Sequence, residues 1–246
     1  MTLDLGTTVA GVRLSFCAMN AAGSAHTAAE IRTLARSESG AVVLQTATAH
    51  PFLHPQFRSL HNPGYDKLLP FVREMAHDAT KPVVASIAGA TPEEYGLLAH
   101  AFSEAGAALI EVNLSDDWVA ATLAPCEDTS VLGAVLHKVS AASTAPVMVK
   151  LPDRPRLAYG RLGDELRAAH VAAVVARNDF TGFEKLLLEG GGGFDIVVVG
   201  GIKSGYDVRR ALAKGARAVQ VGSALVAEGP AVFARLAREM RAARGL

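Results

Sequence analysis

Short apolar runs alternate with amphipathic runs along the whole chain, and this alternation constrains the fold more than any other feature. Eight segments are rich in β-branched and other apolar residues, and eight segments with helical periodicity lie between them. The expected strands are residues 12–19, 41–46, 82–87, 107–113, 146–151, 171–177, 195–200 and 218–222. The expected helices are residues 27–37, 66–78, 92–105, 128–141, 161–169, 182–189, 205–214 and 230–243.

Most of the expected strands are unbroken apolar runs, such as Ile196-Val197-Val198-Val199. That pattern is typical of parallel strands that are covered on both faces. Eight such units in 246 residues predict a (β/α)₈ TIM barrel of the α/β class, as a single domain over residues 1–246. An open doubly wound sheet is the alternative, but no G-x-G-x-x-G follows the first strand. Helix caps and left-handed glycine ends are expected at Thr91, Ser204, Gly40, Gly106 and Gly215.

Charge and composition exclude several classes of function. Lysine plus arginine and aspartate plus glutamate both total 24, so nothing indicates a surface for nucleic acid. No apolar run approaches the ~18 residues of a membrane span, and the N-terminus does not resemble a signal peptide. Cys17 and Cys126 form no disulfide framework, which favours a reduced, cytoplasmic setting. No metal site is expected, because the prolines of "HPFLHP" forbid the helix that would align His50 and His54.

Polar residues or glycines stand at the end of every expected strand. Barrel enzymes place their chemistry at these carboxyl ends. Glycines end the last two strands, in "VVVGGIKSG" and "VQVGSALVAEGP", and a helix follows each. Glycine lets backbone N–H groups approach a phosphate closely, and a helix N-terminus adds a favourable dipole. The pattern therefore favours a phosphate-bearing cofactor or substrate.

Lys150 raises a separate question, because it ends the apolar strand "VMVK" and is followed by Pro152. A buried ammonium requires an anion or loses its proton. The nearest carboxylate in the sequence is Asp153. With amides on the other strand ends, this lysine suits a flat, hydrogen-bonding heterocycle.

Several motifs together resemble the dihydroorotate dehydrogenase family of FMN-dependent barrels. The similar segments are "MNAAG" (19–23), "NPGYD" (62–66), "SIAG" (86–89), "EVNLS" (111–115), "VKLP" (149–152) and the block 198–236. The last block is the most specific, and the similarity spans most of the chain.

The resemblance implies a role for each matching strand end. Lys150 would lie by the pyrimidine edge of the flavin, where negative charge develops on reduction, and would act in catalysis. Ala22 and Gly23 would lie along the ring, and Gln45 and Thr46 would also contact the cofactor. The FMN phosphate would be held by Gly200, Gly201, Gly222 and Ser223. Asn113 and Asn178 would contact both flavin and substrate, and Asn20 and Asn62 would contact the substrate.

The sequence also departs from the family pattern, mainly at the substrate site. The family motif N-L-S-C-P-N carries a cysteine base, whereas this chain reads N-L-S-D-D-W and places Asp116 at that position. Cys126 falls about ten residues later and does not match. A family lysine on the second strand is Gln45 here, and the loop ending at Asn62 lacks the asparagine that contacts orotate. We therefore expect the cofactor site to be kept and the substrate to be altered.

Three functions fit these residues. The first is an FMN-dependent oxidoreductase that acts on a C–C bond next to a carbonyl, with Asp116 as base. The second is an FMN-binding paralogue without catalysis. The third is a flavin-free barrel, an isomerase or lyase for a phosphorylated metabolite, with Lys150 as base or imine former. The expected partner is a small-molecule substrate rather than nucleic acid or membrane, and the resemblance allows a homodimer.

Overall fold

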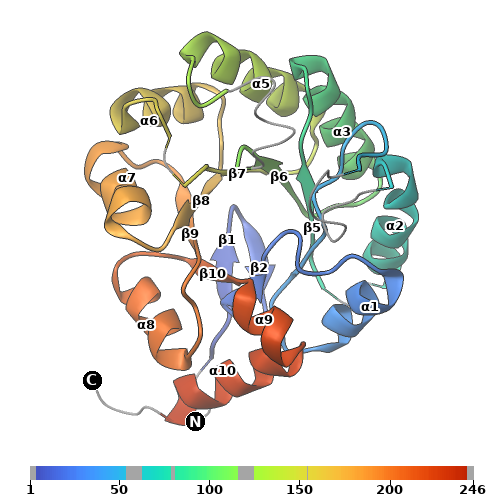
Figure 1. Ribbon diagram of the computed structural model, residues 1–246, viewed down its shortest axis with the longest axis vertical. Helices are drawn as coiled ribbons and strands as arrows, with labels where there is room; N and C mark the ends of the chain where they lie inside the picture. Colours follow the sequence, from blue (N-terminus) through green and yellow to red (C-terminus); the bar gives the residue numbers. More distant parts are fainter. Residues whose placement is uncertain (1–3, 54–62, 79–80, 116–124, 154, 243–246) are drawn as a thin grey trace.

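A ring of parallel strands surrounded by helices forms the body of the protein (Figure 1), so the predicted (β/α)₈ fold is confirmed. The computed structural model describes residues 4–53, 63–78, 81–115, 125–153 and 155–242, apart from the side chains of residues 180 and 181. The barrel strands are β3 (Ala18–Asn20), β4 (Val42–Val43), β5 (Val83–Ile87), β6 (Leu109–Asn113), β7 (Val147–Lys150), β8 (Ala173–Arg177), β9 (Asp195–Val199) and β10 (Ala218–Val221). They follow the order β3-β10-β9-β8-β7-β6-β5-β4, with every ladder parallel.

The helices lie outside the strands, as the sequence predicts. They are α1 (Ala28–Arg36), α2 (Leu69–Asp78), α3 (Pro92–Glu104), α5 (Thr129–Ala142), α6 (Tyr159–Ala168), α7 (Lys185–Glu189), α8 (Gly205–Ala213), α9 (Ser223–Glu228) and α10 (Ala231–Ala242). A 3₁₀ turn, η2 (Tyr65–Lys67), precedes α2, and a π-helical segment, η3 (Phe180–Glu184), precedes α7. The short helix α9 was not predicted as a separate element.

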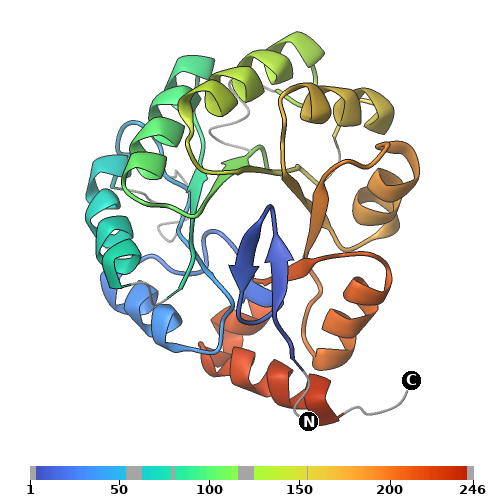
Figure 2. The ribbon, with the colours of Figure 1, turned by 180° about the vertical axis from the view of Figure 1, so that it is seen from behind.

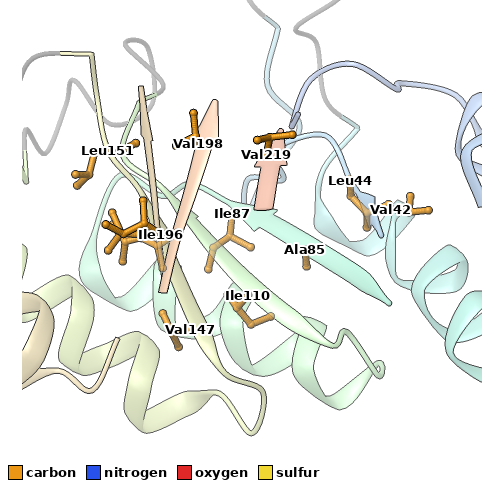
Figure 3. Close-up of a cluster of buried hydrophobic side chains, with 14 of the residues drawn as sticks. Val42, Leu44, Ala85, Ile87, Ile110, Val147, Leu151, Ile196, Val198 and Val219 are labelled. Atoms are coloured by element: carbon orange, nitrogen blue, oxygen red, sulfur yellow. The ribbon is translucent and has the colours of Figure 1, made fainter. Parts of the chain in front are cut away.

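Alternate residues of each strand enter two different cores. One set packs outward against the helices, and Figure 3 shows part of this layer. The other set fills the barrel interior, with Met19, Val84, Leu109, Met148 and Ala218 among its members. Because side chains alternate along a strand, the residue two positions after each of these faces the interior as well. Glu111, Lys150 and Gln220 therefore point inward.

The ring closes between β3 and β4 through a side chain rather than a ladder. Gly40 donates its N–H to Ala18 O at 2.8 Å. The Asn20 amide then acts as a substitute peptide group, since its Nδ2 donates to Val43 O at 2.7 Å and its Oδ1 accepts from Val43 N at 2.8 Å. Asn20 is fully buried. The amide is thus engaged in closing the barrel, and the contact of Asn20 with substrate stays a prediction.

Replacing Asn20 with alanine is expected to destabilise the fold strongly. Both Val43 backbone groups would lose their partners inside the protein, at about 1–3 kcal/mol for each unpaired group. Chemical denaturation should show a loss of about 2–6 kcal/mol in the free energy of unfolding. Ser24→Ala is the control, because Ser24 also contacts Asn20 but leaves Val43 paired. Equal stability of the two variants would contradict the proposed role of Asn20 in closing the barrel between β3 and β4.

The predicted strand 12–19 is wrong, because this stretch divides into two elements. An antiparallel hairpin, β1 (Thr7–Val9) with β2 (Val12–Leu14), precedes the barrel strand β3. Figure 2 shows this hairpin lying across the centre of the ring, and Val9 and Leu14 belong to the interior core. Its turn uses two left-handed residues, Ala10 and Gly11, and Ala10 N is held by Asp195 Oδ2 at 2.8 Å.

Most of the predicted helix ends are confirmed. Thr91 accepts from Glu94 N, Ser204 forms a capping box with Asp207, and Gly106 and Gly215 are left-handed. Gly40 is the exception, since its φ is not positive. Glycine is required there for another reason: a Cβ would collide with the Phe16 carbonyl oxygen.

Candidate functional site

A hydrogen-bonded network joins the carboxyl ends of β4, β5 and β6. Asn113 Nδ2 donates to Thr46 Oγ1 at 2.8 Å, and Thr46 Oγ1 lies 3.1 Å from Ser86 Oγ. Asn113 Oδ1 accepts from both the N–H and the hydroxyl of Ser115, at 3.0 and 2.6 Å. The orientation of the amide is thus fixed, and within the described residues one Asn113 N–H has no partner. Sequence reasoning placed Thr46 and Asn113 in the site but not Ser115.

The carboxyl ends of β6 to β9 border a cavity of about 530 Å³, which is within the size range of small-molecule sites. Four predicted site residues line it: Lys150, Asn178, Gly200 and Gly201. Lys150 and Asn113 are register partners on neighbouring strands, so the cavity adjoins the amide network.

The glycines of this cavity form an open cradle. A Cβ on Gly200 would meet nothing within 4 Å, and one on Gly201 would meet only Asn178 Nδ2, at 3.9 Å. Both glycines have positive φ, at 92° and 70°. Within the part of the chain that the structure describes, their N–H groups donate to no atom. Two unused donors beside open space suit an anionic oxygen, such as that of a phosphate.

The N–H groups at the start of the helix that follows these glycines are already hydrogen-bonded. At the start of α8, Asp207 Oδ2 accepts from the N–H groups of Lys203 and Ser204, at 3.0 and 2.8 Å. Glu239 of α10 accepts from Gly205 N at 2.6 Å. This contact and Arg235 lower the pKa of Glu239. Two carboxylates therefore occupy the helix N-terminus, and the cradle depends on the loop backbone alone.

Lys150 is half-buried at the end of β7 and has no counterion in the described residues. Lys150 lines the cavity, and its ammonium forms no hydrogen bond or ion pair with any of them. Lys150 is therefore the one cationic side chain of the cavity lining without a carboxylate partner among the described residues, and it lies in the same lining as the unused glycine N–H donors.

An ion-pair cluster at the cavity edge was missed by sequence reasoning. Arg177, the last residue of β8, contacts Asp179 through Nε at 2.6 Å and Asp153 through Nη1. All three residues line the cavity. The sequence does place an arginine at a strand end, immediately before Asn178. Its two acidic partners could not be predicted, because they come from different loops.

The remaining predicted residues lie at neighbouring strand ends or outside the description. Ala22 and Gly23 follow β3, and Gly222 and Ser223 follow β10, which pairs with β3. A Cβ on Gly222 would lie 3.7 Å from that of Ala21. Gln45 is buried, 5% exposed. Asp116 and Asn62 lie outside the described residues, so their roles remain predictions.

Neither cysteine is suited to be a catalytic base. Burial raises the pKa of Cys126 to about 12 and that of Cys17 to about 11. A thiol with a raised pKa is almost entirely protonated near neutral pH, and only the thiolate is a nucleophile. This agrees with the mismatch between Cys126 and the family motif.

Iodoacetamide at pH 8 is therefore expected to leave both thiols of the folded protein unmodified. At that pH, four pH units below its pKa of about 12, only about one Cys126 in ten thousand is ionised. Labelling should follow unfolding and should become faster as the pH rises toward 11. Mass spectrometry of folded and urea-unfolded samples measures the difference. Rapid labelling of folded Cys126 would show that the thiol is accessible.

Membrane-spanning helices and metal clusters are both absent from the described residues. None of the helices there is long and apolar enough to cross a membrane. In the same part of the chain, no group of three or more His, Cys, Asp or Glu side chains is arranged to hold a metal ion.

Together, these observations define a (β/α)₈ barrel with a cavity at the carboxyl ends of its strands. Comparison with known proteins narrows this class. The dihydroorotate dehydrogenase family model matches residues 189–243, which include both glycine segments. A protein of Pediococcus pentosaceus assigned as dihydroorotate dehydrogenase A (fumarate) is 30% identical over 277 residues, covering 89% of this chain and 88% of its own.

Further relatives agree with this result. A Streptococcus agalactiae protein with the same assignment is 28% identical and covers 97% of this chain and 93% of its own. The structure of the Eimeria tenella enzyme DHODH with ferulenol has a TM-score of 0.82 at 16% identity, covering 96% and 83% of the two chains, and supports the fold. The chain belongs to the dihydroorotate dehydrogenase family.

Proposed function

We propose that the chain is an FMN-dependent oxidoreductase that acts on a C–C bond next to a carbonyl group, with a substrate other than dihydroorotate. The observation that carries the proposal is the cavity wall, where unused glycine N–H donors and the unpaired Lys150 ammonium lie together. These residues fit a cofactor with a phosphate at one end and a ring that becomes anionic at the other. Family membership supports the same cofactor.

Each group of residues in the candidate site has a proposed role. FMN, when bound, supplies the acceptor for two electrons. Gly200, Gly201, Gly222 and Ser223 offer backbone donors to its phosphate. Asn113 offers one N–H, since its oxygen is already used by Ser115. Asp116 is proposed as the base that takes the substrate proton.

Turnover by FMN-loaded protein tests this proposal. We expect the protein to reduce enones after its flavin has been reduced with dithionite, or to oxidise their saturated counterparts with an artificial electron acceptor. Asp116→Asn should lower turnover by roughly 10²–10⁴ without changing FMN content, which is the usual contribution of one positioned acid or base. Asp164→Asn is the control, because Asp164 is an exposed carboxylate on α6. Tight FMN binding without any turnover would instead support a non-catalytic flavin-binding protein.

Lys150→Ala is expected to lower the reduction potential of bound FMN. A cation near the ring stabilises the reduced, more negative form over the oxidised form, so its removal favours oxidation. A shift of about 30 mV corresponds to about 1.4 kcal/mol in a two-electron couple, so even a partly screened charge is measurable. Lys150→Arg should give an intermediate potential, because the planar guanidinium keeps the positive charge but places it at a different position from the lysine ammonium.

Redox titrations at matched FMN occupancy provide this measurement. Lys138→Ala removes the same charge from the exposed face of α5 and should leave the potential unchanged. If the Lys150→Ala potential equals that of the unmodified protein, Lys150 does not face the flavin, and a role as imine former or structural residue gains support.

A further inference from the structure

A buried polar pair spans the inside of the barrel beneath the candidate site. Gln220 Nε2 donates to Glu111 Oε2 at 2.6 Å, and both side chains are fully buried. Glu111 lies on β6 and Gln220 on β10. Three strands separate β6 from β10 in each direction around the ring, so this hydrogen bond crosses the full width of the barrel.

The pair lies directly under two parts of the site. Glu111 is two residues before Asn113, and Gln220 is two residues before Gly222. Two residues of a strand correspond to about 7 Å and return to the same face. Each partner is thus one inward-facing step below a strand end that the candidate site uses.

Each partner also carries an oxygen that is not satisfied. Glu111 Oε1 and Gln220 Oε1 are both buried and have no hydrogen-bond partner within the described part of the chain. Apart from their mutual hydrogen bond, neither side chain forms a further interaction with the described residues. Unsatisfied buried polar atoms are rare in native proteins, and two on one pair indicate a group that bonds both.

The chemistry of the two unsatisfied oxygens limits which group can bond both of them. Both are acceptors, so the missing group must donate two hydrogen bonds. Rotating the Gln220 amide by 180° does not remove the need, because its oxygen would then face the Glu111 carboxylate. Water is the smallest donor of two hydrogen bonds, and buried waters typically occupy such polar sites between unsatisfied groups.

We propose that Glu111 and Gln220 bind one internal water molecule, which bridges Glu111 Oε1 and Gln220 Oε1. The three groups together form a polar link across the barrel that supports the strand ends at Asn113 and Gly222. This inference does not depend on FMN, since every group in the link belongs to the chain or to solvent.

A crystal structure of the full chain at high resolution tests the proposal. We expect one density peak within about 2.6–3.2 Å of both free oxygens. A second crystal, soaked in thallium(I), separates water from a monovalent cation, because thallium gives an anomalous signal. A thallium peak between the two oxygens would overturn the proposal in favour of a cation site. A direct bond between the two oxygens, with no peak, would overturn it in favour of a neutral acid–amide pair.

The variant Glu111→Gln provides a matched structural test. Its new amide can donate directly to Gln220 Oε1 while still accepting from Gln220 Nε2, so the water should be displaced and the fold kept. If the water stays in place in this variant, its O–H groups donate to atoms other than the two free oxygens, which contradicts the proposed bridge.

Gln220→Met extends the test to solution. Methionine has a similar length but no donor, so the Glu111 carboxyl group would lose its direct partner. Leaving a buried charged group without its partner is strongly destabilising, and we expect the melting temperature to fall by roughly 6–20 °C. Glu111→Gln, with reciprocal amide bonds, should stay within about 3 °C of the unmodified protein. Equal melting temperatures for the two variants would contradict the cross-barrel link.

Discussion

Gly201→Val should abolish retention of FMN during purification. The unused N–H groups of Gly200 and Gly201 border space that is open in the structure, and a valine side chain would project into it. A phosphate oxygen could then no longer approach the backbone. We expect the FMN affinity to fall by about 100-fold or more, equivalent to about 2.7 kcal/mol. Fluorescence titration with FMN measures the dissociation constant.

The control must carry the same backbone strain, because Gly201 has a left-handed φ of 70°. Valine in that conformation costs about 1–2 kcal/mol wherever it occurs. Gly192 has a φ of 69°, and a Cβ there would meet nothing within 4 Å. It lies before β9, at the opposite end of that strand from Gly201. Gly192→Val should match Gly201→Val in stability but bind FMN normally. Unchanged FMN affinity in Gly201→Val would refute the proposed phosphate position.

Dihydroorotate is expected to be a poor substrate even for fully FMN-loaded protein. The resemblance indicates three altered substrate contacts: Asp116 in place of a cysteine base, Gln45 in place of a lysine, and a loop without its asparagine. One missing acid–base group typically lowers the rate by roughly 10²–10⁴, and the other changes weaken binding of an anionic substrate. We therefore expect kcat at least about 100-fold below that of a dihydroorotate dehydrogenase assayed in parallel.

Partial rescue distinguishes an altered substrate from an inactive protein. Asp116→Cys combined with Gln45→Lys should raise dihydroorotate turnover relative to either single variant, while FMN occupancy is held equal. If the unmodified protein turns over dihydroorotate within tenfold of the parallel enzyme, the matching of this loop to the family motif is wrong.

The regular parts of the fold were predictable because their signals are local. Continuous apolar strands such as β9, the capping residues Thr91 and Ser204, and the glycines before β6 and β10 each depend on nearby residues. The hairpin was missed because its left-handed turn is Ala10-Gly11, without the Asn or Asp that usually marks such a turn. Its second strand therefore merged with β3 into one apparent run.

Contacts between residues distant in sequence could not be predicted. Asn20 bonds Val43, Gly40 is pressed against Phe16, and Glu239 occupies the start of a helix 34 residues earlier. No local pattern reveals such partners. Polar strand ends indicated the face of the barrel where the cavity lies, whereas the partners of each side chain depend on three-dimensional packing.

The visible absorption spectrum of the protein, purified without added flavin, tests the central proposal most directly. If the cavity at the carboxyl ends of β6 to β9 holds FMN, the protein should absorb near roughly 450 nm with about one FMN per chain after acid release. Gly201→Val should lose this absorption and Gly192→Val should keep it. A colourless protein that also fails to bind added FMN would contradict the account and favour a flavin-free barrel that acts on a phosphorylated metabolite.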